Sequence, residues 1–394
     1  MSWKDNFGFT DRLRAMQSLT TAYQQASSSP VSAFAEAMAQ AKQLETEAYD
    51  TATSKDEYNS ICQKAIDDAE SAGPRNLAIG SPQHVEDDYE ESETSTGEVI
   101  GQYRSCSHHY GGLHSSIYRS KWEDGTVRAV KVTIPHMMTA PHDAHREARL
   151  LREASHPHII PLIETFNLDG GRFVLVFPFI RYDLEQLLRR DMVTAAQTRS
   201  ILRDLFCALA HLHSMGILHR DIKPSNILMD SPNGPAYLAD FGISWKEGDA
   251  GSEPPTQKIT DVGTTCYRPP EILFGLKEYG TTLDMWAAGC VVAEAIAVGH
   301  RQLFDSGPVG SDLSLIFSIF KLLGTPDEQR WPEVRVLPDW GKVEFHSFPT
   351  QRWEDILPGA SSNGRDLVSH LLRYESSERL SATEALAHPY FTRT

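Results

Sequence analysis

The order of strand-like and helix-like segments limits the folds open to this chain. Short runs rich in β-branched and aromatic residues predict strands up to about residue 180, and helical periodicity dominates from Leu184 onward. The strand-like runs are 127–133 and 173–180, with a helical segment at 144–154. The later helical stretches are 198–213, 282–297 and 364–372. We therefore expect an α+β domain over 100–394, with a small sheet lobe (about 100–180) and a large helical lobe (about 181–394).

The region before residue 100 has a different composition. Residues 1–72 are rich in Ala, Gln and Glu, and apolar side chains recur at helical spacing, which predicts a helical extension. These side chains include Phe34, Met38, Ala41 and Leu44. Residues 73–99 contain Gly-Pro and Ser-Pro pairs and the acidic run 86–91, and such a composition cannot bury enough apolar surface to order itself. We expect an acidic flexible linker there.

Charge and cysteine usage exclude several classes of protein. The chain has 53 acidic and 37 basic residues, a net charge of −16, so it lacks the basic field that binds nucleic acid. The longest apolar run, 285–299, is shorter than a membrane span and contains Glu294. Five scattered cysteines show no zinc-binding spacing, which favours reduced thiols. We expect an intracellular protein of the nucleus, the cytoplasm or both, with no membrane or nucleic-acid partner.

One stretch carries side chains suited to phosphoryl transfer. The sequence His-Arg-Asp-Ile-Lys-Pro-Ser-Asn spans 219–226, and Asp-Phe-Gly follows at 240–242. Phosphoryl transfer needs a carboxylate at the attacking hydroxyl, a cation beside the moving phosphate and oxygen ligands for Mg²⁺. Each motif alone is compatible with a turn or a capped helix. Their occurrence together at this spacing favours a catalytic site.

In these motifs the chain resembles the eukaryotic protein kinases over about residues 100–394. The resemblance implies a bilobal protein kinase fold, ATP and Mg²⁺ as cofactors, and protein substrates. Asp221 would orient the substrate hydroxyl and accept its proton, and Lys223 would neutralise the γ-phosphate. Asn226 and Asp240 would bind Mg²⁺. Lys223, two residues after Asp221, is the form found in serine/threonine kinases.

The resemblance also assigns the nucleotide site. Lys131 ends a strand and would hold the α- and β-phosphates, with Glu147 as its ion-pair partner. Pro178 departs from the family in the hinge, but it loses only an N–H, so its carbonyl and the backbone of Ile180 can still bind adenine. The residues expected to bind ATP are Gly112, Ile117, Ala129, Lys131, Phe177, Pro178, Ile180 and Leu228.

The glycine-rich loop is eroded. Its three glycine positions hold Tyr110, Gly112 and Ser115, and Gly111 compensates only in part. Glycines there allow the backbone to approach phosphate, so we expect weakened ATP binding. Leu113 and His114 occupy the loop positions where many cyclin-dependent kinases are inhibited by phosphorylation, and neither has a hydroxyl.

The activation segment runs from the motif at 240–242 to Glu271. This segment and the carboxyl-terminal part resemble the cyclin-dependent kinases. The quoted stretches are Gly-Thr-Thr-Cys-Tyr-Arg at 263–268, Lys-Leu-Leu-Gly-Thr-Pro-Asp at 321–327 and His-Pro-Tyr-Phe at 388–391. By position, Arg268 would turn a backbone carbonyl of the segment away, with left-handed Gly263 beside it, which permits proline after the target residue. Glu271 and Arg379 would form a buried ion pair. Asp284 would brace the backbone of the catalytic loop, residues 219–226.

Two departures argue against a typical cyclin partner. Of the segment 142–147, only Arg146 and Glu147 match the cyclin-binding helix, and Ile259 occupies the position of the activating phosphothreonine, with Thr260 beside it. The activation-segment residues of interest are Thr260, Gly263, Thr264 and Arg268. The phosphate pocket would consist of Arg146 and Arg220, with Lys246 as a third cation.

These losses resemble the divergent monomeric fungal kinases that activate cyclin-dependent kinases, which makes cyclin-dependent kinases the expected substrates. Three alternatives remain: an orphan proline-directed kinase, a pseudokinase scaffold suggested by the eroded loop, and a binding module in residues 1–72. All of the expected catalytic residues are present, which argues against the scaffold.

Overall fold

The computed structural model describes residues 97–111, 115–122, 125–307 and 310–392, together with part of the amino-terminal region. In that region it describes residues 18, 19, 22, 23, 41, 44, 45, 48, 49, 51, 52 and 54 and helix α3, Lys55–Ala72. The chain forms two compact units, residues 1–93 and 94–394. No helix within these described parts is long and apolar enough to cross a membrane.

The first unit is helical in its described part. Tyr58 and Cys62 of α3 belong to a small buried apolar cluster with Leu19, Ala41 and Ala48. Tyr58 donates a hydrogen bond to Glu45, at 3.0 Å. Of the apolar residues on which the helical prediction depended, Ala41 and Leu44 lie in helix, whereas Phe34 and Met38 fall outside the described residues.

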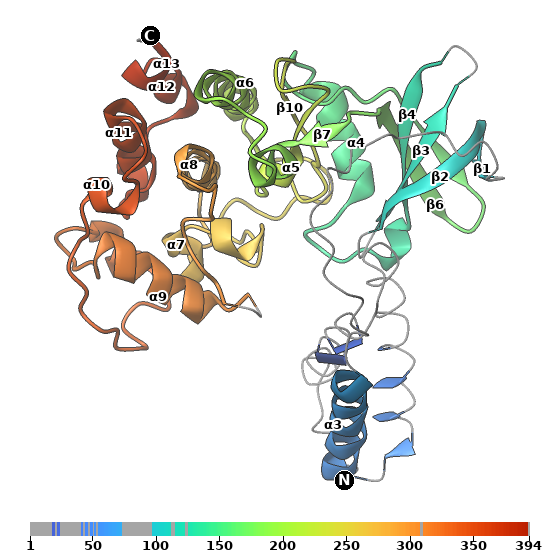
Figure 1. Ribbon diagram of the computed structural model, residues 1–394, viewed down its shortest axis with the longest axis horizontal. Coiled ribbons are helices and arrows are strands. Elements are labelled where there is room, and N and C mark those ends of the chain that lie inside the picture. Colours follow the sequence, from blue (N-terminus) through green and yellow to red (C-terminus); the bar gives the residue numbers. More distant parts are fainter. Residues whose placement is uncertain are drawn as a thin grey trace, which may run out of the picture. The chain divides into compact units, whose positions relative to one another are not determined.

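The second unit begins with a six-stranded antiparallel sheet in the order β1-β2-β3-β4-β6-β5. Its strands are β1 Glu98–Ile100, β2 Tyr103–Gly111, β3 Ser115–Lys121, β4 Val127–Thr133, β5 Glu164–Leu168 and β6 Arg172–Pro178. Helix α4, Ala144–Glu153, lies beside the sheet (Figure 1), and its Ala148 and Leu151 share a buried core with Leu175 of β6. The sheet therefore includes the last two residues of the expected linker 73–99, because Glu98 pairs with Cys106 of β2.

A larger helical lobe follows. Its helices are α5 Leu184–Arg189, α6 Ala195–Ser214, α7 Pro270–Leu273, α8 Thr282–Ile296, α9 Asp312–Leu323, α10 Trp353–Ile356, α11 Ser362–Leu371, α12 Ala382–Leu386 and α13 Pro389–Thr392. Short 3₁₀ turns are η2 Pro135–Met137, η3 Pro224–Asn226, η4 Thr265–Tyr267, η5 Pro332–Val336 and η6 Ser376–Glu378. Small strands are β7 Tyr182–Asp183, β9 Ile227–Met229 and β10 Tyr237–Leu238 in one sheet, and β8 Ile217–Leu218 with β11 Trp245–Lys246 in another. The second unit thus has the expected α+β architecture of two lobes.

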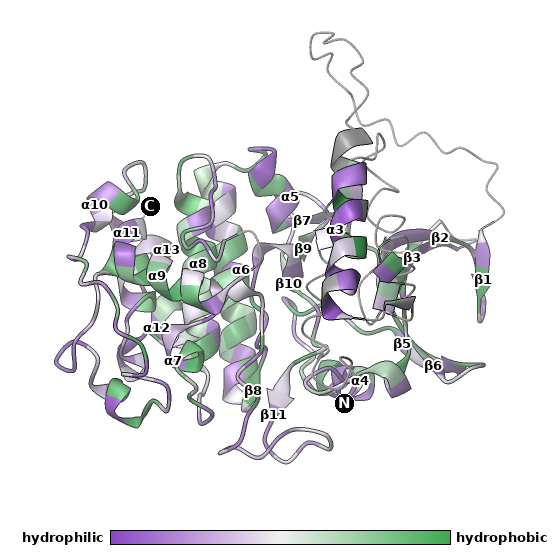
Figure 2. Cartoon of the chain, turned by 90° about the horizontal axis from the view of Figure 1, so that it is seen from below, coloured by the Kyte–Doolittle hydropathy of each residue, from purple (hydrophilic) through white to green (hydrophobic). Residues whose placement is uncertain are grey.

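Sequence features explain the main helices of this lobe. Helix α6 begins at a capping box in which Thr194 and Gln197 satisfy each other's backbone N–H groups. Helix α8 is apolar along most of its length and is buried from Leu283 to Ala295, which makes it the centre of the lobe (Figure 2). The run 173–180 is strand only as far as Pro178, so the predicted strand was two residues too long at its end.

Candidate active site

Three charged side chains meet where the sheet faces the helical lobe. Lys131 lies within β4, which continues two residues beyond it, so it does not end the strand as expected. Its Nζ lies 2.7 Å from Glu147 Oε1 on α4 and 2.9 Å from Asp240 Oδ1. Burial opposes the charge on Lys131, but the two carboxylates outweigh it and raise its pKa. The charge of Lys131 in turn holds the pKa of Asp240 far below its usual value. The sequence paired Lys131 with Glu147, and the structure places them in contact.

Asp240 and Asn226 are the two residues expected to bind Mg²⁺. The Asn226 Nδ2 group donates to Asp221 O at 2.8 Å and to Asp221 Oδ2 at 3.1 Å, so its amide oxygen is left for another partner. The Asp240 side chain is half exposed, at 49%. Carboxylate and amide oxygens are the ligands that Mg²⁺ prefers, so this pair fits the ion that the resemblance implies.

Asp221 lies at the centre of a second group of contacts. Its Oδ1 accepts hydrogen bonds from the Thr264 N–H at 3.0 Å and from the Thr264 hydroxyl at 2.9 Å. Lys223 Nζ lies 2.9 Å from Asp221 Oδ2 and 3.0 Å from the Thr264 hydroxyl. Gly263 has φ +75°, and a Cβ there would lie 2.6 Å from the carbonyl oxygen of Arg220. Glycine is therefore required for the activation segment to approach the catalytic loop this closely.

Buried groups fix the backbone on both sides of Asp221. Asp284 of α8 accepts hydrogen bonds from the N–H groups of His219, at 2.9 Å, and Arg220, at 2.8 Å. His219 packs edge-on against Phe241 with ring centroids 4.9 Å apart, and its Nε2 lies 3.0 Å from Ala239 O. The expected brace at Asp284 is present, and it ties the catalytic loop to the centre of the lobe.

Most of the described residues expected around adenine lie on strands of the two lobes, and Ile180 follows the end of β6. In the β4–β6 pairing, Ala129 faces Phe177 and Arg128 faces Pro178. The partly buried side chains of Ala129, Ile180 and Leu228 pack against the core cluster that contains Phe177. On β3, Ile117 pairs with Lys131.

The glycine-rich loop is described only at its two ends. Tyr110 pairs with Ile117 and Gly111 with Ser116, next to a bulge in β2, and the Tyr110 side chain is exposed. Gly112, Leu113 and His114 lie outside the described residues, so the expectation for Gly112 remains a prediction.

Arg268 holds the activation segment as its position suggests. Its Nε donates to the carbonyl oxygen of Gly263 at 3.0 Å, and its guanidinium also lies 2.7 Å from Asp261 and 3.3 Å from Asp312. Thr260 is half-buried, and its carbonyl oxygen accepts the N–H of Val262. The geometry expected around Gly263 is therefore formed.

The observed surroundings of the predicted phosphate pocket differ from the prediction in two respects. Lys246 is not part of it, because this residue of β11 directs its amino group to Glu153 on α4 while Trp245, its neighbour, takes the buried side. The Arg220 guanidinium is already paired with Glu253, at 3.0 Å. Arg146 donates to the carbonyl oxygens of Gly251, at 2.8 Å, and Pro141.

Sequence reasoning missed Glu253. The only signal in the sequence was an acidic residue in the activation segment of a chain that retains the two arginines of the expected phosphate pocket.

The comparisons with known proteins agree with this geometry. A model of the protein kinase domain matches residues 111–391. The chain belongs to the protein kinase family. Serine/threonine-protein kinase csk1 of Schizosaccharomyces pombe is 39% identical to this kinase over 287 residues, which cover 72% of this chain and 92% of the relative. Cyclin-dependent kinase 20 of Danio rerio is 34% identical over 286 residues, 71% of this chain and 80% of the relative. This is a serine/threonine protein kinase of the cyclin-dependent kinase-like group, and it uses ATP.

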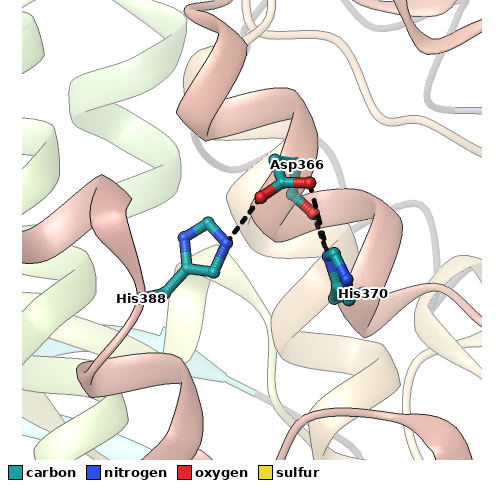
Figure 3. Close-up of side chains that lie close together, drawn as sticks. All are labelled: Asp366, His370 and His388. Atoms are coloured by element: carbon teal, nitrogen blue, oxygen red, sulfur yellow. Dashed lines mark hydrogen bonds and ion pairs between the residues drawn. The ribbon is translucent and has the colours of Figure 1, made fainter.

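A second polar group, in the helical lobe of the kinase, has side chains that could bind a metal ion. Asp366 and His370 lie on α11, and His388 directly precedes α13 (Figure 3). His388 Nδ1 accepts the N–H of Tyr390 at 3.2 Å, so the proton of the neutral ring is on Nε2, which lies 3.0 Å from Asp366 Oδ2. A metal on Nε2 would force the proton onto Nδ1, against the Tyr390 N–H. We therefore assign the contact between His388 and Asp366 to the attachment of α13 to α11.

Proposed function

We propose that this kinase phosphorylates serine or threonine in other kinases of the cyclin-dependent group, and that it needs neither a phosphorylated activation segment nor a cyclin. One observation carries the proposal: both halves of the site are assembled in the unmodified chain alone. Lys131 contacts Glu147 and Asp240, and Thr264 contacts Asp221. In protein kinases, activation serves to put the Lys–Glu pair and the metal-binding Asp in place.

Each residue has a role in the proposed transfer. Lys131 would hold the α- and β-phosphates, and Asp240 and Asn226 would hold Mg²⁺, which when bound neutralises charge on the phosphates. Asp221 would orient the substrate hydroxyl and accept its proton as the oxygen bonds to the γ-phosphorus. The bond from that phosphorus to the β–γ bridging oxygen breaks, leaving ADP and a phosphoprotein. Lys223 would neutralise charge on the moving group.

Two departures from the group support the substrate class. Ile259 stands where the activating phosphothreonine is expected, and the residues before Arg146 differ from a cyclin-binding helix. A kinase without these control points is suited to act on cyclin-dependent kinases that retain them. The likeness to csk1 and to cyclin-dependent kinase 20 is compatible with this assignment.

A second candidate, an orphan proline-directed kinase, is favoured by one contact. Arg268 Nε donates to the Gly263 carbonyl oxygen at 3.0 Å, so this carbonyl is not available to accept an N–H from the substrate residue that follows the phosphorylated one. Proline, which lacks an N–H, is then accepted.

One experiment tests both candidates. Bacterially made, phosphatase-treated full chain is incubated with labelled ATP and a panel of catalytically inactive cyclin-dependent kinases, each with its activation-segment threonine intact or replaced by alanine. Peptides with proline or alanine after the target serine are run in parallel, and Asp221→Asn is the control. We expect label only in kinases with the intact threonine. Label confined to proline-containing peptides would favour the second candidate, and no label without an added cyclin or upstream kinase would contradict autonomous activity.

A further inference from the structure

The guanidinium of Arg220 is paired with a carboxylate of the activation segment. Arg220 Nη1 lies 3.0 Å from Glu253 Oε1, and Nη2 lies 3.3 Å from Oε2. The Arg220 side chain is 0% exposed and that of Glu253 is 12% exposed. Arg220 is one of the two arginines expected to receive an activating phosphate, so an acidic group of the same chain already occupies that place.

Glu253 also connects the two ends of the segment. Its Oε1 accepts the N–H of Ile259 at 3.4 Å, and its carbonyl oxygen accepts the indole N–H of Trp245 at 2.8 Å. The Tyr279 hydroxyl donates to the carbonyl oxygen of Ile259 at 2.6 Å. The Glu253 carboxylate thus joins the catalytic loop to the position of the missing phosphothreonine, and the backbone of Glu253 holds the segment's start at Trp245.

Aromatic rings enclose the charges. The Arg220 guanidinium lies 5.5 Å from the Tyr279 ring centroid and 5.9 Å from that of Trp245. Lys258 Nζ lies 4.7 Å and 5.2 Å from the Trp245 and Tyr279 rings. A buried cation without a carboxylate would be costly here. Burial opposes the ionisation of Glu253, but Arg220 outweighs it and lowers the pKa of Glu253.

The arrangement leads directly to the catalytic carboxylate. Arg220 precedes Asp221, and its carbonyl oxygen lies against Gly263, the residue before Thr264. Fixing the Arg220 side chain therefore also fixes Asp221 and the turn at Gly263 that brings Thr264 into contact with Asp221.

We propose that Glu253 replaces the activating phosphate, acting as a positioning residue that orders the activation segment of the unmodified kinase through Arg220. The inference rests on the proposed autonomous activity and names its cause. A carboxylate carries one charge and two oxygens, whereas a phosphate carries more of both. Accordingly, within the described part of the chain, the Nε groups of Arg146 and Arg220 remain without a hydrogen-bond partner. The Glu253 carboxylate thus binds Arg220, whereas the Arg146 guanidinium binds backbone carbonyl oxygens.

The test compares phosphatase-treated, full-length wild type with Glu253→Gln, Glu253→Asp and the matched control Glu247→Gln. Glu247 lies in the same segment and is exposed. Readouts are kcat and KM for a peptide substrate, ATP affinity by calorimetry, and hydrogen exchange of residues 247–268 and of α8. The loss of charge-assisted hydrogen bonds predicts that Glu253→Gln lowers kcat about 10- to 100-fold. In Glu253→Gln, hydrogen exchange should rise in 247–268 only, and ATP affinity should stay within about twofold of wild type. Glu253→Asp should retain more activity than Glu253→Gln. The control Glu247→Gln should match wild type.

Two results would overturn the inference. Wild-type kcat in Glu253→Gln would show that the carboxylate is dispensable while leaving the proposed function intact. Equal losses in the Gln and Asp variants, together with faster exchange throughout α8, would make Glu253 a general stability residue. An inactive unmodified wild type is a separate outcome, because it contradicts autonomous activity itself.

Discussion

Replacing Arg379 by methionine should strongly destabilise the helical lobe. Arg379 forms two short bonds to Glu271, at 2.6 and 2.7 Å, and the two side chains are 0% and 1% exposed. The guanidinium also donates to the carbonyl oxygens of Arg373, Thr282 and Tyr374. Methionine preserves much of the volume but leaves all of these acceptors without their donor.

The expected cost follows from the charge left behind. Removing one partner of a buried ion pair costs about 3–5 kcal/mol. Burial already raises the pKa of Glu271 with Arg379 present, so in the variant the carboxyl group should take up a proton, which limits the loss. Domains are stable by only about 5–15 kcal/mol, so the change removes a large share of the free energy of unfolding.

Urea unfolding followed by far-ultraviolet circular dichroism measures this loss. The control is Arg352→Met, because Arg352 forms the same two-bond pair with Asp355, at 2.9 and 3.0 Å, but the side chains are 75% and 56% exposed. We expect the control to keep the wild-type midpoint and Arg379→Met to unfold at much lower urea. Equal midpoints for the two variants would refute the reasoning.

The remaining predictions concern the active site. Lys131→Met and Asp221→Asn should each abolish incorporation of labelled phosphate while circular dichroism stays that of the wild type, and substantial residual transfer by either would refute the catalytic assignment. The double replacement Tyr110→Gly and Ser115→Gly should tighten ATP binding measured by calorimetry, because it restores close backbone approach, and unchanged affinity would contradict that account. Lys131 lowers the pKa of Asp240, so this carboxylate stabilises the fold above the usual aspartate pKa and loses that contribution as pH falls through the lower folded value. The melting temperature of Asp240→Asn should therefore lie furthest below wild type above about pH 4 and should begin to approach it only as pH falls below that value; a gap that stays constant down to strongly acidic pH would contradict this.

The sequence was sufficient where function fixes both residue type and spacing. The strand 127–133 was predicted with its observed bounds, and Lys131, Glu147 and Asp240 meet as their motifs imply. Local periodicity determines the strand, and each motif lies at a set distance from an element's end. Such features need no knowledge of loop geometry.

The activation segment could not be predicted in the same way. Position-by-position comparison identified Ile259 as the replaced phosphothreonine and passed over Glu253, because the segment's path rather than its sequence brings Glu253 to Arg220. Lys246 was assigned to the wrong surroundings for a related reason. Strand alternation turns it to Glu153, and nothing in its own sequence context revealed that β11 would form there.

The pair formed by Arg220 and Glu253 bears on how a cell could silence this enzyme. A phosphorylated loop is reversible because a phosphatase hydrolyses its ester, whereas a glutamate side chain offers no such bond. Output would then follow the rates of synthesis and degradation, and the location of the protein, rather than a cycle of modification. Such an enzyme supplies a constant signal, and its targets carry the timing.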